Sequence, residues 1–149
     1  MAISVQFETV IARSVDDVFA QLAAVERFPE WLVASGIVRV ERAPGPLQTG
    51  TALRIEQRIA GRATTLEGAI AALEPARRLA FRAKDREGIS VEAEALLSPE
   101  GAGCRLRWSV KIGLPLKFRL FESMAAPEAR RAAATDLENL RRRLESVAG

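Results

Sequence analysis

The chain has 149 residues, 48% of them hydrophobic, and carries a formal net charge of +3. This length and composition suit one domain built on one hydrophobic core, so we expect residues 1–149 to form a single domain. The charges are spread along the chain and aromatic residues make up only 5% of it. This pattern argues against a nucleic-acid-binding module, which gathers basic residues among exposed aromatic ones.

The residue types that are missing from the sequence exclude several kinds of catalytic and metal-binding site. The chain has no histidine and no tyrosine, and its single cysteine is Cys104. Histidine is the commonest general base and metal ligand, so zinc sites of Cys and His and nucleophile systems that need His cannot be assembled. No glycine-rich phosphate-binding motif occurs either. We therefore expect no metal, no cofactor and no catalytic residue of these kinds.

The sequence also bears on location. No apolar run approaches the ~20 residues of a membrane-spanning helix, and residues 1–6 lack the features of a secretory signal. One cysteine allows no internal disulfide. These features predict a cytoplasmic protein, while the mild positive charge leaves peripheral contact with an anionic membrane surface open.

The first third of the chain predicts one strand and two short helices. Residues 3–11 alternate apolar and polar side chains, as in a half-buried strand. Ser14, followed by two aspartates, has the pattern of a helix N-cap. We predict a second short helix over residues 29–32, beginning at Pro29. Trp31 is interpreted as a side chain that fills the core, in preference to one at the mouth of a pocket.

Residues 37–112 predict six strands. Apolar and polar side chains alternate in segments separated by Gly and Pro turns, which favours an antiparallel meander with one buried face. The alternation blurs at residues 71–73, which indicates a bulge. Charged residues of the other face are expected to be solvated and to pair across strands.

Residues 115–147 have the strongest helical periodicity. Their apolar residues recur every three or four positions, which predicts a long helix with a stripe packed on the core. Pro127 predicts a kink or a restart of this helix. We expect the half before Pro127 to border a ligand and to be more mobile than the half after it. The residues of the predicted stripe are Leu116, Leu120, Met124, Leu137, Leu140, Leu144 and Val147.

The predicted order is β-α-α-β6-α: an α+β helix-grip fold, in which a seven-stranded antiparallel sheet wraps around a long C-terminal helix. With this order the chain resembles the START-like (SRPBCC) superfamily, in particular its polyketide cyclase/dehydrase and lipid-transport group and the small subunits associated with carbon monoxide dehydrogenase. The likeness is carried by residues 7–19, by the Phe-Pro-Glu-Trp of residues 28–31, by the Glu74-Pro75 turn with Leu79 and Phe81 after it, and by residues 137–140.

The resemblance implies a cavity between sheet and long helix that binds lipids, polyketides or other apolar molecules. Catalytic members place polar residues, often His or Tyr, on the cavity wall, and this chain has neither. We therefore predict a binding or carrier protein for an apolar or amphipathic small molecule. Two alternatives stay open: a cyclase- or hydrolase-type enzyme that uses a buried carboxylate, and a protein-interaction or assembly subunit.

The predicted ligand site is a mostly apolar inner face with a few polar anchors. Gly68, Ala93 and Ala95 are small and are expected to leave room on that face. The predicted ligand-binding residues are Phe28, Trp31, Leu53, Ile55, Gln57, Thr64, Leu66, Phe81, Trp108, Leu120 and Met124.

Few polar groups are expected among these inward side chains. They are the amide of Gln57, the hydroxyl of Thr64, the indole N–H of Trp108 and the thiol of Cys104. Glu67, beside the predicted bulge, and Asp136, on the long helix, are the carboxylates best placed to be buried. Both are nevertheless expected to be solvated, because unpaired carboxylates rarely lie inside a protein.

Overall fold

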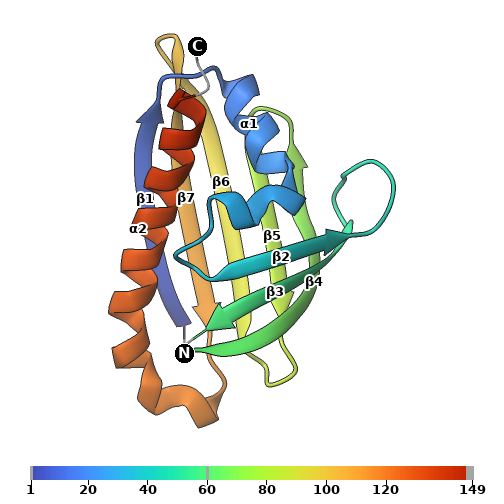
Figure 1. Ribbon diagram of the computed structural model, residues 1–149, viewed down its shortest axis with the longest axis vertical. Coiled ribbons are helices and arrows are strands. Elements are labelled where there is room, and N and C mark those ends of the chain that lie inside the picture. The colour runs from blue at the N-terminus through green and yellow to red at the C-terminus, as the bar shows by residue number, and fades with distance from the viewer. Residues whose placement is uncertain (1, 60, 147–149) are drawn as a thin grey trace.

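The computed structural model describes residues 2–59 and 61–146, and its seven strands form one antiparallel sheet crossed by a long C-terminal helix (Figure 1). The strand order is β1-β7-β6-β5-β4-β3-β2. This arrangement confirms the predicted helix-grip fold. The elements are β1 (Ala2–Ile11), α1 (Val15–Ala23), η1 (Val25–Glu30), β2 (Ile37–Arg42), β3 (Ala52–Ile59), β4 (Arg62–Glu74), β5 (Arg78–Lys84), β6 (Ser90–Glu100), β7 (Gly103–Gly113), η2 (Leu116–Phe121) and α2 (Glu122–Ser146).

The two faces of the sheet follow from the alternation of side chains along each strand. Trp108 of β7 lies opposite Phe7 of β1 and Ala95 of β6, so the apolar positions of neighbouring strands share the inner face. On the outer face, Glu8 accepts hydrogen bonds from Arg105 at 3.3 Å and from Arg107 at 2.9 Å. The expected cross-strand ion pairs of the outer face are therefore confirmed.

The two short helices cover part of the inner face. Ser14 caps α1 as predicted, since its Oγ accepts a hydrogen bond from the Asp17 amide at 3.1 Å. The second helix was predicted over 29–32 and is instead a 3₁₀ helix over Val25–Glu30. Val25 and Phe28 are buried and stand three residues apart, which matches the three-residue turn of a 3₁₀ helix.

The predicted bulge is confirmed by a shift of register between β4 and β5 at Ile70 and Ala72. The expectation that Gly68 leaves room on the inner face is wrong. A Cβ atom on Gly68 would lie only 1.8 Å from the carbonyl oxygen of Arg82, so the backbone of β5 already fills that space. Glycine is required at this position because the two strands approach each other so closely.

The C-terminal region differs from its prediction in two ways. Residues 116–121 form the separate 3₁₀ helix η2, and α2 then runs without interruption from Glu122 to Ser146. The predicted restart at Pro127 is wrong, because Pro127 is a residue of the second turn of α2. A proline at this position removes a single intrahelical hydrogen bond, and the helix continues through it. Figure 1 shows the chain changing direction between η2 and α2. Val147 lies outside the described residues.

The predicted apolar stripe is buried only in its second half. Leu137, Leu140 and Leu144 are 4%, 0% and 6% exposed, and α2 packs along β1. Leu116, Leu120 and Met124 are 77%, 87% and 72% exposed, so the prediction that they pack on the core is wrong. The first part of the stripe faces away from the sheet.

We predict that amide hydrogens exchange faster in residues 116–127 than in residues 133–144. The first segment buries few apolar side chains, so local opening there costs less free energy. Hydrogen–deuterium exchange followed by mass spectrometry, with β7 peptides as a protected reference, tests this. Equal protection of both segments would contradict it.

Candidate functional site

Four aromatic side chains form the centre of the interior. Phe28 and Trp31 come from η1 and the residue that follows it, Phe81 from β5, and Trp108 from β7. Ring centroids lie 5.9 Å apart for Phe28–Trp31, 5.5 Å for Phe28–Phe81 and 5.3 Å for Trp31–Trp108. Trp31 has no exposed surface, which confirms its interpretation as a core residue. This aromatic cluster joins the sheet to η1.

Other predicted site residues divide into two groups. Leu53, Ile55 and Leu66 are buried on β3 and β4 and belong to the same hydrophobic core as the aromatic cluster. Leu120 and Met124 lie apart from them, on η2 and the first turn of α2. The structure therefore brings most of the predicted site together and leaves these two side chains on the surface.

Three of the four predicted polar anchors already have partners within the fold. The amide of Gln57 donates a hydrogen bond to the Ser35 carbonyl at 2.7 Å. The hydroxyl of Thr64 donates to Asp85 Oδ2 at 3.2 Å, and the thiol of Cys104 lies 3.6 Å from the carbonyl oxygen of Arg105. Burial raises the pKa of the Cys104 thiol, so it stays protonated and unreactive.

The fourth anchor, the indole N–H of Trp108, is buried without a hydrogen-bond partner in the described chain, and so is the indole N–H of Trp31. The two rings meet edge to face at an interplanar angle of 67°. The sequence predicts Trp31 as a core residue from its apolar area, and the predicted polar anchors do not include its indole N–H. The two unpaired donors therefore belong to neighbouring rings in the interior, whose centroids lie 5.3 Å apart.

The carboxylate of Asp136 is fully buried, so the expectation that it is solvated is wrong. It accepts hydrogen bonds from the Ala34 amide at 2.7 Å, from the Ser35 amide at 3.1 Å and from the Ser35 hydroxyl. Burial raises the pKa of Asp136, and these bonds partly offset that increase. Glu67 is exposed, as expected.

Residues 31–36, which we call the roof segment, are held on both sides. Asn139 of α2 donates to the Trp31 carbonyl at 3.3 Å. On the other side, the Arg58 amide of β3 donates to the Gly36 carbonyl at 2.8 Å. Gly36 has φ +81°, and a Cβ atom there would lie 2.3 Å from the Arg58 carbonyl oxygen, so only glycine fits. The roof segment thus fixes Trp31 against Trp108.

Coverage of the interior differs between its two ends. Far from η2, Leu97 of β6 and Cys104 and Leu106 of β7 are buried, and α1 contacts both strands. At the end near η2, Ile3 and Val5 of β1 are buried, but several other inner-face residues are only partly buried. They are Val91, Val110, Ile112, Leu114, Ala125, Ala126 and Ala129. The interior is therefore closed at one end and incompletely covered at the other.

A hollow of about 460 Å³ lies on the opposite side of the sheet. Its floor includes Ala80, and charged residues of β5, β6 and β7 surround it. Arg78 and Glu94 at its edge form an ion pair at 2.7 Å. This hollow is an open trough in the charged outer face, distinct from the predicted interior site.

No group of three or more Cys, Asp or Glu side chains that could hold a metal ion occurs in residues 2–59 and 61–146. Among the helices described here, none is both long and apolar enough to cross a bilayer.

A twisted antiparallel sheet closed by a C-terminal helix over an apolar interior defines a helix-grip protein. The family model described as "Polyketide cyclase / dehydrase and lipid transport" matches residues 2–145, and the chain belongs to this family. A search of curated proteins finds no match.

Solved structures of low sequence identity share the fold. The Zhui aromatase/cyclase of Streptomyces sp. R1128 is 18% identical, with a TM-score of 0.79 over 97% of this chain and 94% of that one. A protein from Thermus thermophilus is 16% identical, with a TM-score of 0.77 over 98% and 99% of the two chains. A START superfamily protein from Mycobacterium smegmatis is 14% identical, with a TM-score of 0.76 over 97% and 99%.

We predict that Asp136→Ala lowers the free energy of unfolding by about 3 kcal/mol, because the Ala34 and Ser35 amides lose their carboxylate acceptor. Ser35→Ala removes only the hydroxyl bond and should cost about 1 kcal/mol. Urea denaturation at pH 7 measures both changes. Equal effects of the two variants would contradict the role given to the Asp136 carboxylate.

The same carboxyl group should make stability depend on pH. Because its pKa is raised on folding, its contribution to stability is fully present below its ordinary pKa of 3.8 and declines as the pH rises through the raised value. Asp136→Asn removes this titration. Urea denaturation of wild type and Asp136→Asn from pH 3 upward should show the difference in unfolding free energy changing in that window. A constant difference would contradict the assignment.

Proposed function

We propose that this protein binds and carries an apolar or amphipathic small molecule in the interior between the sheet and α2. The observation that carries the proposal is the incomplete cover of the interior at the η2 end. There Ala125, Ala126 and Ala129 of α2, and Val110 and Ile112 of β7, are only partly buried against the core. Alanine side chains are too short to fill this space, so the η2 end is where a ligand enters.

The description of the family, which names lipid transport as well as polyketide cyclisation, supports this function. The cyclase- or hydrolase-type alternative requires a buried carboxylate that is free to exchange protons. Both oxygens of Asp136 already accept hydrogen bonds from the roof segment. We therefore assign Asp136 a structural role and favour binding over catalysis.

The binding function is tested by blocking the open end. We expect Ala129→Phe to abolish binding of a lipid or polyketide probe, because the added ring occupies the interior. Ala134→Phe is the matched control, since Ala134 is exposed on the same helix. Native mass spectrometry of the purified protein with a panel of fatty acids, phospholipids and aromatic polyketides measures occupancy. A panel without any bound species, or equal occupancy in both variants, would contradict the proposal.

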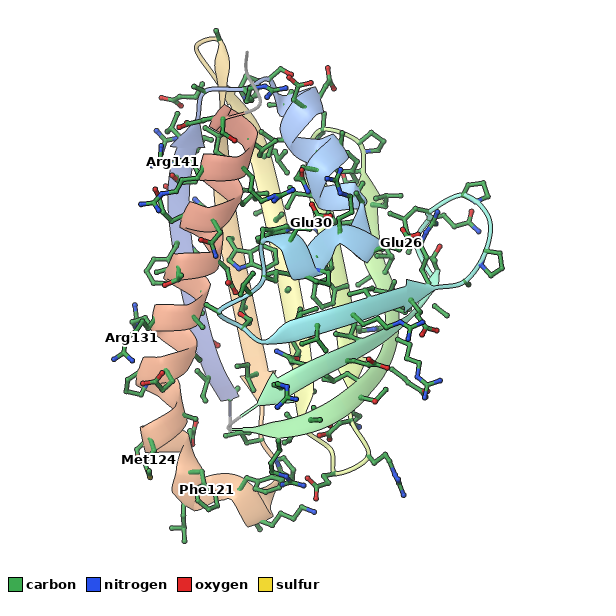
Figure 2. All side chains as sticks on the ribbon, in the orientation of Figure 1. Glu26, Glu30, Phe121, Met124, Arg131 and Arg141 are labelled. Carbon is green, nitrogen blue, oxygen red and sulfur yellow. The ribbon has the colours of Figure 1, made fainter. Side chains whose placement is uncertain are left out.

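We further propose that the η2 end contacts an anionic membrane surface when cargo is exchanged. Figure 2 shows Phe121 and Met124 at this end of the molecule. Leu116, Leu120, Phe121 and Met124, which we call the η2 patch, are 77%, 87%, 56% and 72% exposed.

Basic residues accompany the η2 patch. Lys117 lies within it, and Arg130 and Arg131 follow on α2. Lys84 ends β5, and the loop that follows carries Arg86 and meets η2, since Lys117 lies 3.8 Å from Glu87 of that loop. Apolar side chains next to basic ones suit the headgroup region of an anionic bilayer.

The expected affinity is modest. Moving the exposed parts of four large apolar side chains out of water is worth on the order of 5 kcal/mol in total. Contact of this strength is reversible, like anchoring by a single acyl chain. A carrier needs this property, because it must leave the membrane with its cargo.

We predict that the double variant Leu120→Ser, Phe121→Ser binds phosphatidylglycerol-containing vesicles at least about fivefold more weakly than wild type. Val33→Ser, Val38→Ser is the matched control, because these valines are 58% and 53% exposed but lie away from η2. Vesicle co-sedimentation, repeated with neutral phosphatidylcholine vesicles, measures binding. Equal loss in both double variants, or no binding of wild type, would overturn the membrane contact.

A further inference from the structure

We infer that the indole N–H groups of Trp31 and Trp108 form a donor pair that binds a neutral hydrogen-bond acceptor of the cargo, such as the carbonyl oxygen of a ketone, ester or quinone. The inference rests on the proposed binding function and adds the chemical class of ligand. Both nitrogens are buried and lack a hydrogen-bond partner within the described chain, and the two rings lie 5.3 Å apart.

Contact between the rings does not satisfy both donors. In an edge-to-face pair, the N–H of one indole can point at the face of the other, a weak interaction. The second indole cannot return the contact in the same geometry. Ring faces, including that of Phe28, are weak acceptors, so neither indole N–H has a full hydrogen-bond partner among the described residues, and an unmade hydrogen bond in the interior is unfavourable.

Water is a less suitable partner than a carbonyl oxygen at this place. A buried water needs two to four polar partners and must also donate hydrogen bonds. The Trp31 carbonyl already accepts from Asn139 and the Ser35 carbonyl from Gln57, so each has one lone pair left to offer a water molecule. A carbonyl oxygen only accepts, so it matches the indole donors without needing an acceptor of its own.

The site selects by charge as well as by hydrogen bonding. The buried side-chain atoms left without a partner in the described chain are all nitrogen donors: Gln21 Nε2, Trp31 Nε1, Trp108 Nε1 and Arg143 Nε. Arg143 bonds Glu30 through another nitrogen, so its charge is directed to the surface. The aromatic cluster itself contains no cation to face the two indoles, and an ionised carboxylate there would be buried without a counter-ion. Neutral acceptors are therefore preferred over anions.

The test uses two probes of similar shape. 2-Acetylnaphthalene carries a carbonyl oxygen, and 2-isopropylnaphthalene carries a methyl group in its place. The chain has two tryptophans, so the ¹H–¹⁵N spectrum of the full-length protein contains two indole signals, both from this site. We expect the ketone to move at least one indole proton downfield relative to the hydrocarbon, since both probes exert similar ring currents.

The affinities of Trp→Phe variants for the two probes provide a second test. Trp108→Phe and Trp31→Phe remove one N–H each but keep an aromatic ring, and each should weaken ketone binding by about two- to tenfold, the value of one hydrogen bond. Hydrocarbon binding should change by less than that in both. Phe28→Leu is the control, because it alters the aromatic cluster without removing a donor and should affect the two probes equally.

The outcomes distinguish failure of the proposed donor pair from failure of the proposed binding function. A downfield indole shift with the ketone alone, together with selective loss in a Trp→Phe variant, supports the donor pair. If both probes bind with equal indole shifts and equal sensitivity to the variants, the donor pair is overturned and the binding function stands. If neither probe binds and the lipid panel also fails, both are overturned. The wild-type spectrum decides the question even where a Trp→Phe variant does not fold.

Discussion

The position of α2 relative to the roof segment depends on the carboxylate of Asp136. It accepts hydrogen bonds from Ala34 and Ser35, residues more than 100 positions earlier in the chain. Apolar packing between α2 and β1 fixes their separation but allows one to slide along the other, whereas hydrogen bonds to two adjacent amides fix a single register. Because Trp31 belongs to the same roof segment, the register of α2 also sets the position of Trp31 over Trp108.

The composition of α2 explains why the interior is closed at one end only. Leu137, Leu140 and Leu144 reach the sheet and fill the space beneath them. Ala125 and Ala129, on the earlier turns, leave their neighbours partly buried. The later turns of α2 therefore hold the helix on the sheet, and its earlier turns border the incompletely covered end of the interior. In the proposed function, the η2 end can admit a ligand without moving the leucines away from the sheet.

Most of the fold could be predicted because it is encoded locally. Strand alternation, the Ser14 cap and the bulge after Ile70 each depend on neighbouring residues. The role of Asp136 could not be predicted, because its partners are backbone amides far away in sequence and leave no side-chain pattern. The spacing of Leu120 and Met124 indicated an apolar face but not whether this chain covers it. The four-residue period is the same for a helix on a core and a helix on a membrane.

The polar groups of the interior are of two kinds: some are hydrogen-bonded within the fold, and others are not. Gln57 and Asp136 are hydrogen-bonded to the roof segment, so changing either alters the structure itself. The indole nitrogens of Trp31 and Trp108 make no hydrogen bond with the residues that the structure describes. Replacing an indole N–H therefore removes no native hydrogen bond, and the choice of cargo can change without the stability that Asp136 provides. In the proposed binding function, this separation allows one scaffold to take different apolar ligands, with selectivity set at the aromatic cluster.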